Sequence, residues 1–257
     1  MNVQELFSLQ GKTAVVTGGG RGLGFQIAEG LAEAGANIVL CSRKLEACEE
    51  TAALLEKKGV QTAAFACDVT SQDQVEHVIS ETKKRFGTID ILVNNSGATW
   101  GAPAADMPLE AWQKVMNVNV TGTFLMSQAA GRVMIEQQAG KIINIASVAG
   151  LKSSAPEVMD TIGYNTSKGA IITFTKDLAS KWGQHNVHVN AVAPGFFPTK
   201  MSKVIMEHGG EAILANTPLG RFGGPDELKG VVLFLASRAS DYITGDVLIV
   251  DGGSHVR

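Results

Sequence analysis

Thr17-Gly18-Gly19-Gly20-Arg21-Gly22-Leu23-Gly24 is the stretch that decides the fold, because it joins a β-branched run to a helical pattern. In such a strand–turn–helix unit, Gly18 permits the tight turn, Gly22 lets the backbone approach a pyrophosphate, and Gly24 allows close helix packing. The phosphates would lie at the helix N-terminus, where free N–H groups and the helix dipole favour negative charge. No Gly-Lys-Ser/Thr follows, so the turn is not a mononucleotide P-loop.

The same alternation of short strand patterns and longer helical patterns continues along the chain, which is typical of βαβ units with a parallel sheet. We predict an α/β protein with a single Rossmann-fold domain over residues 1–257. Its doubly wound parallel sheet should have about seven strands, with helices on both faces. The predicted strands are 12–17, 37–41, 62–66, 89–94, 140–146, 187–193 and 247–250, and the predicted helices are 22–34, 44–58, 72–86, 109–138, 162–183 and 225–236. Gly35, Gly59, Gly87 and Gly183 are placed to end helices in the left-handed conformation.

One long segment, residues 194–224, interrupts the alternation. It is mixed in character and contains Phe196, Phe197, Met201 and Met206. A long excursion after a strand end in a compact domain is more often a functional lid than a plain connection. We therefore expect a substrate lid over about 194–224.

Composition excludes several classes of protein. The net charge of −3 over 257 residues does not indicate a nucleic-acid or anionic-membrane partner. The first residues lack the pattern of a signal peptide, and no apolar run approaches the ~20 residues of a membrane-spanning helix. The three cysteines form no CxxC pair and the five histidines no HExxH motif, so we expect no metal site. We expect a cytoplasmic protein with no membrane or nucleic-acid partner.

The end of the second strand indicates which nicotinamide cofactor binds. An acidic residue at this place would bond the ribose 2′-OH of NAD, but the strand ends in Ser42 and Arg43, with no acid before Glu46. Ser42 can donate a hydrogen bond to a 2′-phosphate, Arg43 can supply a charged fork, and Arg21 can approach the same group. We predict NADP(H). The alternative is that Arg43 is a solvated residue at the start of a helix.

Two further strand ends carry polar residues that suit a cofactor. Asp68, within Cys67-Asp68-Val69, could accept a hydrogen bond from the adenine amino group or cap a turn, and the two roles are compatible. Asn94-Asn95-Ser96-Gly97 closes the fourth strand, and Gly97 allows the backbone to approach the cofactor closely.

Tyr164 and Lys168 are the candidate catalytic pair, because a spacing of four residues puts them on one face of a helix. A phenol has a pKa near 10, and a nearby ammonium with an oxidised nicotinamide would lower it. A lowering of about two to three pKa units corresponds to roughly 3–4 kcal/mol. Tyr164 would then exchange a proton with a carbonyl or alcohol oxygen, and Ser147 would hydrogen-bond that oxygen. Alone, a tyrosine and a lysine at this spacing are a weak signal. Together with the glycine turn and Ser147 in this order, they indicate hydride exchange between a nicotinamide and a carbonyl.

These motifs resemble those of the short-chain dehydrogenase/reductase family over essentially the whole chain. The resemblance rests on the glycine turn, Asn94–Gly97, Ser147, Tyr164 with Lys168, Pro194-Gly195 and Asp251-Gly252-Gly253. It implies that Asn119, in Asn119-Val120-Thr121-Gly122, is the fourth catalytic residue and holds a water that links Lys168 to solvent. It also implies a homotetramer and a nicotinamide end contacted by Pro194, Gly195 and Thr199. The full set of expected cofactor contacts is Gly18, Arg21, Gly22, Leu23, Gly24, Ser42, Arg43, Asp68, Val69, Asn95, Ser96, Gly97, Tyr164, Lys168, Pro194, Gly195, Phe197 and Thr199.

The chain departs from the usual family pattern at two places. Ser96 replaces the usual alanine, and the stretch from Ser147 to Tyr164 is a few residues longer than in most members. The longer stretch should wall the substrate pocket, so the substrate of any one relative does not transfer directly.

The substrate remains open among three classes, since the fold does not choose between them. The Cys-Ser-Arg segment and the long 147–164 stretch resemble gluconate 5-dehydrogenase-type reductases of sugar acids, and Lys152 and Lys200 either attract an anionic substrate or are simply solvated. A 3-oxoacyl-[acyl-carrier-protein] reductase is the first alternative, but Gln138 and His185 stand where such enzymes present arginines. A broad carbonyl reductase is the second alternative. The residues that would line an apolar pocket are Trp100, Met159, Phe196 and Phe197. A non-catalytic NADP(H)-binding sensor is a remote fourth class.

Overall fold

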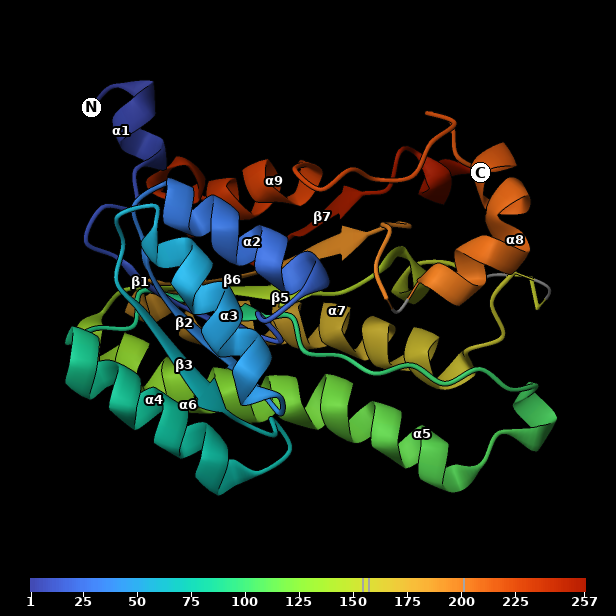
Figure 1. Ribbon diagram of the computed structural model, residues 1–257, viewed down its shortest axis with the longest axis horizontal. Coiled ribbons are helices and arrows are strands. Elements are labelled where there is room, and N and C mark those ends of the chain that lie inside the picture. Colours follow the sequence, from blue (N-terminus) through green and yellow to red (C-terminus); the bar gives the residue numbers. More distant parts are fainter. Residues whose placement is uncertain (154, 157, 201) are drawn as a thin grey trace.

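The computed structural model describes residues 1–257 except 154, 157 and 201 (Figure 1). Ser154 and Glu157, in the 147–164 stretch, and Met201, in the 194–224 segment, therefore lie outside the described residues. Seven strands form one parallel sheet: β1 Thr13–Thr17, β2 Asn37–Ser42, β3 Thr62–Ala66, β4 Ile91–Asn94, β5 Gly140–Ile145, β6 Val187–Pro194 and β7 Val247–Val250. The strand order is β3-β2-β1-β4-β5-β6-β7. The direction of winding reverses between β1 and β4, and ligands of such sheets bind at this reversal, beyond the carboxyl ends of the strands.

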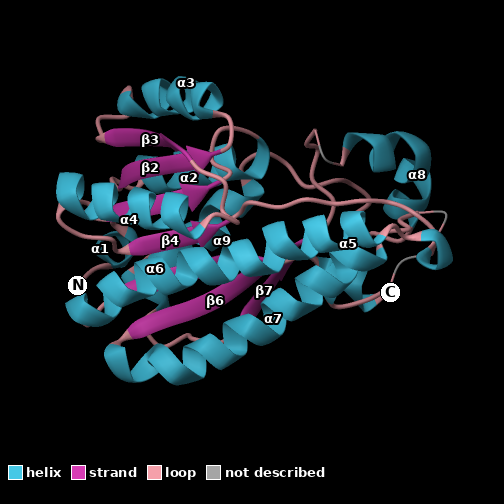
Figure 2. Ribbon diagram, turned by 90° about the horizontal axis from the view of Figure 1, so that it is seen from below, coloured by secondary structure: helices cyan, strands magenta, loops and turns pink. Residues whose placement is uncertain are grey.

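Helices cover both faces of the sheet, as predicted (Figures 1 and 2). One face packs against α2 Gly22–Glu33, α3 Leu45–Glu56 and α9 Glu227–Ala236, and the other against α4 Gln72–Phe86, α6 Gly122–Gln137 and α7 Ile162–Trp182. Each face of the sheet has its own hydrophobic core, and successive residues of β1 point into opposite cores. Val16 lies in the core under α2, α3 and α9, and Val15 lies in the core under α4, α6 and α7. This explains why the middle of the strand, Ala14–Val16, is apolar on both sides.

Two helices of the structure were not predicted. The short α1, Val3–Phe7, precedes β1, and α8, Lys203–Ala215, lies within the predicted lid. Figure 1 shows α8 beyond the strand ends, close to the C-terminus. The guanidinium of Arg257 donates to the carbonyl of Ala215 at 3.3 Å, which ties the two segments together.

The long helix predicted over 109–138 is interrupted. It runs as α5, Leu109–Met116, then a π-helical turn, Asn117–Thr121, and then α6. Such turns are rare and frequently occur at functional sites. Asn119 lies inside this turn, which the amphipathic pattern of the sequence does not reveal.

The helix-ending glycines are confirmed at three of four positions. Gly35, Gly59 and Gly87 have φ values of 98°, 84° and 79°. The prediction for Gly183 was wrong, because the chain there continues into a short 3₁₀ turn, Gly183–His185. Asn186 takes the left-handed conformation instead, with φ 56°, and its side-chain amide donates to the carbonyl of Gln138 at 3.1 Å.

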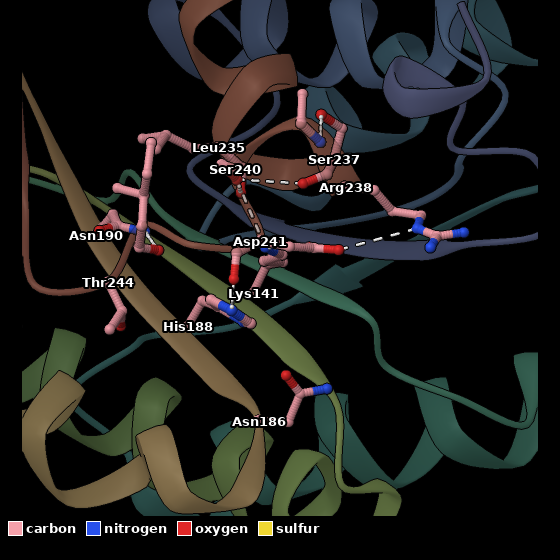
Figure 3. A network of polar contacts seen from close by, with 12 residues as sticks. Lys141, Asn186, His188, Asn190, Leu235, Ser237, Arg238, Ser240, Asp241 and Thr244 are labelled. Carbon is pink, nitrogen blue, oxygen red and sulfur yellow. Dashed lines mark hydrogen bonds and ion pairs between the residues drawn. The ribbon is translucent and has the colours of Figure 1, made fainter. Parts of the chain in front are cut away.

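A polar network anchors the edge of the sheet at its amino end (Figure 3). Lys141 on β5 forms an ion pair with Asp241 at 2.9 Å, and the ring of His188 on β6 contacts the Asp241 carbonyl at 2.9 Å. Asn190 donates to the carbonyl of Ile243 at 3.0 Å. Burial lowers the pKa of Lys141, and Asp241 opposes that shift. These contacts fix the connection from α9 to β7, at the end of the sheet opposite the catalytic residues.

Candidate active site

A cleft of about 1160 Å³ lies along the carboxyl ends of the strands. This volume is somewhat above the roughly 300–1,000 Å³ typical of small-molecule sites. Every residue predicted to contact the cofactor lines the cleft, and so do Ser147, Met159 and Phe196. Asn119 and Trp100 do not line it.

The glycine turn has the conformation that a pyrophosphate site requires. Gly18 and Gly22 have φ values of 65° and 57°, which favour glycine. A β-carbon at Gly24 would overlap the Gly18 carbonyl oxygen and lie 2.5 Å from the side-chain nitrogen of Asn95. Among the described residues, the side chain of Arg21 at the N-cap of α2 makes no capping hydrogen bond, so the first N–H groups of the helix are available to an anion. The turn therefore fits a dinucleotide phosphate.

Hydrogen bonds hold the loop after β4 against this turn. The hydroxyl of Thr17 accepts from the backbone N–H groups of Asn95 and Ser96, at 3.0 and 2.9 Å. The side-chain amide of Asn95 donates to the carbonyls of Thr17 and Gly18, at 3.0 and 3.3 Å. The predicted residues of two strand ends thus form one wall of the cleft.

Cations gather around the end of β2. Arg21, Arg43 and Lys44 are exposed and line the cleft, and Lys44 was not singled out from the sequence. The Ser42 hydroxyl is already engaged, since it donates to the Lys44 carbonyl at 3.0 Å and accepts from the thiol of Cys48 at 3.3 Å. To donate to a phosphate, the Ser42 hydroxyl must give up its hydrogen bond to the Lys44 carbonyl. Arg21 and Arg43 are therefore the stronger candidates for binding the 2′-phosphate.

Asp68 forms the predicted turn contact. One carboxylate oxygen accepts from the backbone N–H and the hydroxyl of Thr70, at 3.0 and 2.7 Å. The backbone hydrogen bond from Thr70 is the main reason that the pKa of Asp68 is lowered, and the charge of Arg43 adds to the effect. The second carboxylate oxygen is left for a ligand.

Tyr164, Lys168 and Ser147 meet where β5 ends and α7 begins. The Lys168 ammonium is 5.6 Å from the centre of the Tyr164 ring and donates to the carbonyl of Ile145 at 2.6 Å. The Ser147 loop packs directly on α7, because a β-carbon at Gly150 would lie 2.5 Å from the backbone of Lys168. The geometry brings all three residues to the cleft, as the sequence predicted.

Burial dominates the acid–base properties of this group. It lowers the pKa of Lys168 to about 8, so the side chain is mostly protonated at pH 7. It raises the pKa of Tyr164, while a hydrogen bond with Ser147 lowers it. The prediction that Lys168 lowers the pKa of the phenol does not hold for the protein alone, where burial raises this pKa and the opposing effect comes from Ser147.

Asn119 forms a buried clamp instead of facing the cleft. Its side-chain oxygen accepts from the N–H of Ala98 at 2.7 Å, and its amide donates to the Ala98 carbonyl at 2.9 Å and to the Ser167 hydroxyl at 2.8 Å. Ser167 in turn donates to the carbonyl of Tyr164 at 2.7 Å. The clamp connects the segment after β4 to the backbone of Tyr164. The water-holding role of Asn119 stays a prediction.

A second buried chain of polar side chains lies beneath the catalytic residues. Asn94 donates to Ser127 and to Asn144, both at 2.9 Å, and Asn144 donates to Thr175 at 2.9 Å. Asn144 precedes Ile145, whose carbonyl holds Lys168. The network ties β4, β5, α6 and α7 together at the base of the site.

The substrate end of the cleft differs in part from the prediction. Met159, Phe196 and Phe197 line it, but Trp100 is 47% exposed and does not. The preceding residues Ala98 and Thr99 line the cleft. Lining residues that the sequence did not indicate are Lys114, Ser202, Ile205, Ala212, Ile213, Asn216 and Ser254, several of them from the unpredicted α8.

The two lysines considered for anion binding both line the cleft. The Lys152 ammonium donates to the carbonyl of Ser254 and, at 3.4 Å, to that of Arg257. Lys152 therefore joins the 147–164 stretch to the C-terminal turn. Lys200 is exposed.

The described residues were also expected to hold no metal site and no membrane span. No group of three or more His, Cys, Asp or Glu side chains is arranged to hold a metal ion. None of the described helices has the length and apolar character needed to cross a bilayer.

Comparisons with known proteins agree with this geometry. A family model described as enoyl-(acyl carrier protein) reductase matches residues 18–255. The chain is 39% identical over 256 residues to a 5-keto-D-gluconate 5-reductase of Escherichia coli K12, covering 98% of both chains. It is 42% identical over 246 residues to a 3-oxoacyl-[acyl-carrier-protein] reductase of Aquifex aeolicus, covering 95% of this chain and 98% of the relative. The crystal structure of a gluconate 5-dehydrogenase from Burkholderia cenocepacia J2315, in complex with NADP and tartrate, matches with a TM-score of 0.94 at 37% identity over the full length of both chains.

Proposed function

The chain belongs to the short-chain dehydrogenase/reductase family, and from that premise we propose that it is an NADP(H)-dependent oxidoreductase that interconverts a secondary alcohol and a ketone. The observation that carries this proposal is the meeting of Ser147, Tyr164 and Lys168 in one cleft with the uncapped glycine turn. When bound, NADP(H) gives or accepts the hydride.

The residues of the chain take the following roles in this proposal. Ser147 hydrogen-bonds the substrate oxygen and fixes its position beside Tyr164. Tyr164 gives its proton to that oxygen in reduction and takes it back in oxidation. Lys168, protonated at pH 7, stabilises the phenolate and contributes to holding the cofactor ribose. Asn119 positions Tyr164 through Ser167 and also holds the water that returns the proton.

NADP(H) is favoured over NAD(H) by the charges at the end of β2. Arg21, Arg43 and Lys44 line the cleft and are available to bind a 2′-phosphate. The acid that bonds the ribose 2′-OH in NAD enzymes has no counterpart between Ser42 and Glu46. The NADP bound to the similar Burkholderia enzyme agrees with this assignment.

We propose a sugar acid or polyol as the substrate class. The printed names of two similar proteins, a 5-keto-D-gluconate 5-reductase and a gluconate 5-dehydrogenase, support it. A carrier-protein reductase is the alternative that the Aquifex relative favours. Against it, Gln138 and His185 contact each other at 3.3 Å in place of the arginines of such enzymes. A broad carbonyl reductase remains the third candidate, and a non-catalytic sensor the remote one.

The proposal also covers the domain organisation, the oligomeric state and the cellular compartment of the protein. We propose one domain over residues 1–257, a homotetramer, and a substrate lid over 194–224 that α8 stiffens. The cytoplasm is the expected compartment, since the three cysteines are buried as free thiols, as is usual where thiols stay reduced. Sedimentation that gives a monomer would contradict the tetramer.

Fluorescence titration with NADPH and NADH tests the cofactor assignment. NADPH should bind much more tightly, and Arg43→Ala should remove most of that preference, whereas equal binding of both cofactors would contradict it. Turnover is then measured on 5-ketogluconate, an acetoacetyl thioester and aromatic ketones. The preferred compound identifies the substrate class, and tight NADPH binding without turnover of any compound would favour the sensor.

A further inference from the structure

A second cavity of about 450 Å³ lies beside the active-site cleft and is lined by residues of the 147–164 stretch and of the first turn of α7. The two cavities share four lining residues: Ala149, Lys152, Ser153 and Met159. These residues form the partition between them. A substrate that reacts at Tyr164 and extends past the partition would reach the second cavity.

The lining of the second cavity is rich in hydrogen-bonding groups. Asp160, Thr161, Asn165 and Thr166 line it in addition to Lys152 and Ser153. Thr161 donates to the side-chain oxygen of Asn165 at 2.9 Å. Within the described part of the chain, the side-chain amide of Asn165, the carboxylate of Asp160 and the hydroxyl of Thr166 have no further protein partner. These groups offer both donors and acceptors to a ligand.

This chemistry selects among substrate classes. A polyhydroxylated chain can form hydrogen bonds with the amide, carboxylate and hydroxyl groups that have no other partner among the described residues. An apolar acyl chain would strip the same groups of water without replacing the hydrogen bonds, which costs free energy for each group. The cavity is therefore suited to a hydroxylated chain and poorly suited to a fatty acyl chain.

Met159 lies in the partition between the two cavities. It lines both, and methionine is an unbranched side chain that adapts its shape easily. The ammonium of Lys152 is held by the carbonyls of Ser254 and Arg257, which leaves Met159 as the large side chain of the partition that can move.

We propose that the second cavity is a subsite for the hydroxylated far end of the substrate, and that Met159 is the gate that admits it. This inference rests on the proposed ketone reductase activity and narrows its substrate to polyhydroxylated ketones longer than the catalytic pocket alone accepts.

The test compares two series of ketones, reduced with NADPH by the wild type and by variants. One series is hydroxyketones of three to seven carbons, and the other is 2-alkanones of the same lengths. Met159→Ala should raise kcat/KM for the longest hydroxyketones relative to the shortest, and Met159→Phe should lower it, each by about five- to tenfold. Asn165→Leu should lower kcat/KM for long hydroxyketones by about the same factor, the size of one lost hydrogen bond, and leave the alkanones unchanged.

Met116→Ala is the matched control, because Met116 lines neither cavity. It should leave the dependence of kcat/KM on chain length, the length profile, unchanged in both series. NADPH affinity is measured for every variant and should equal that of the wild type. Unchanged length profiles in both Met159 variants, or an equal loss on both series in Asn165→Leu, would overturn the subsite while the reductase activity stands. A wild type that reduces only the acetoacetyl thioester or the aromatic ketones would overturn the subsite alone. A wild type that binds NADPH but reduces neither series and none of those compounds nor 5-ketogluconate would overturn the proposed function and the subsite with it.

Discussion

Lys168 carries a charge inside the protein, so replacing it with methionine should stabilise the fold. The residue is 6% exposed, and burial lowers the pKa of its ammonium from 10.5 to about 8. A pKa difference of about 2.5 corresponds to roughly 3 kcal/mol. Methionine keeps the apolar stem but loses the hydrogen bond to the Ile145 carbonyl, worth about 1 kcal/mol. We expect Lys168→Met to raise the free energy of unfolding by about 2 kcal/mol at pH 7.

The pH dependence of this difference follows from the same pKa. Below pH 8 both the folded and the unfolded chain hold the proton of Lys168, so the cost of burying the charge is fully present. Between pH 8 and about 10.5 the folded chain releases the proton while the unfolded chain keeps it, so the wild type gains stability relative to the variant. The difference between the two proteins should therefore fall from about 2 kcal/mol at pH 7 to near zero at pH 10.

Urea unfolding followed by circular dichroism measures this difference at both pH values. Lys176→Met is the matched control, because Lys176 is exposed on the same helix, and it should change the free energy of unfolding by less than about 0.5 kcal/mol. A Lys168→Met protein that is less stable than the wild type at pH 7, or a stability difference independent of pH, would refute the reasoning.

Three further substitutions test the residues around the site. Ser167→Ala should lower kcat about five- to tenfold with NADPH affinity unchanged, because the link from Asn119 to the Tyr164 backbone is lost; the exposed Ser180→Ala is its control in the same steady-state assay. Gly24→Ala should abolish NADPH binding in a fluorescence titration, since the β-carbon has no room; binding of wild-type strength would contradict the packing. Asn144→Ala should cost about 1–3 kcal/mol in urea unfolding, and a loss below 0.5 kcal/mol would show that the buried network contributes little.

Local patterns explain why so much of the fold could be predicted. The two-sided burial of β1 appears in the sequence as an uninterrupted apolar run, and the glycine turn has its own conformational signature at Gly18 and Gly22. The catalytic residues could be predicted because Tyr164 and Lys168 are neighbours on one helix and Ser147 follows a strand. Each of these patterns spans only a few consecutive residues, so it can be recognised without knowledge of the tertiary structure.

The remaining features depend on tertiary contacts. The engagement of the Ser42 hydroxyl by Cys48, the outward direction of Trp100 and the packing of α8 on the cleft depend on segments that the local pattern does not describe. The π-helical turn at Asn119 similarly coincides with the side-chain hydrogen bonds to Ala98 and Ser167, which are distant in the sequence. These are the places where sequence reasoning was incomplete.

Single-turnover reduction of the preferred ketone by wild type and Tyr164→Phe, each saturated with NADPH, tests the central claim most directly. The loss of the phenol proton should slow NADPH oxidation by a factor of about 10²–10⁴ while the affinity for NADPH stays the same. A variant that oxidises NADPH within tenfold of the wild-type rate would contradict the assignment of Tyr164 as the proton donor.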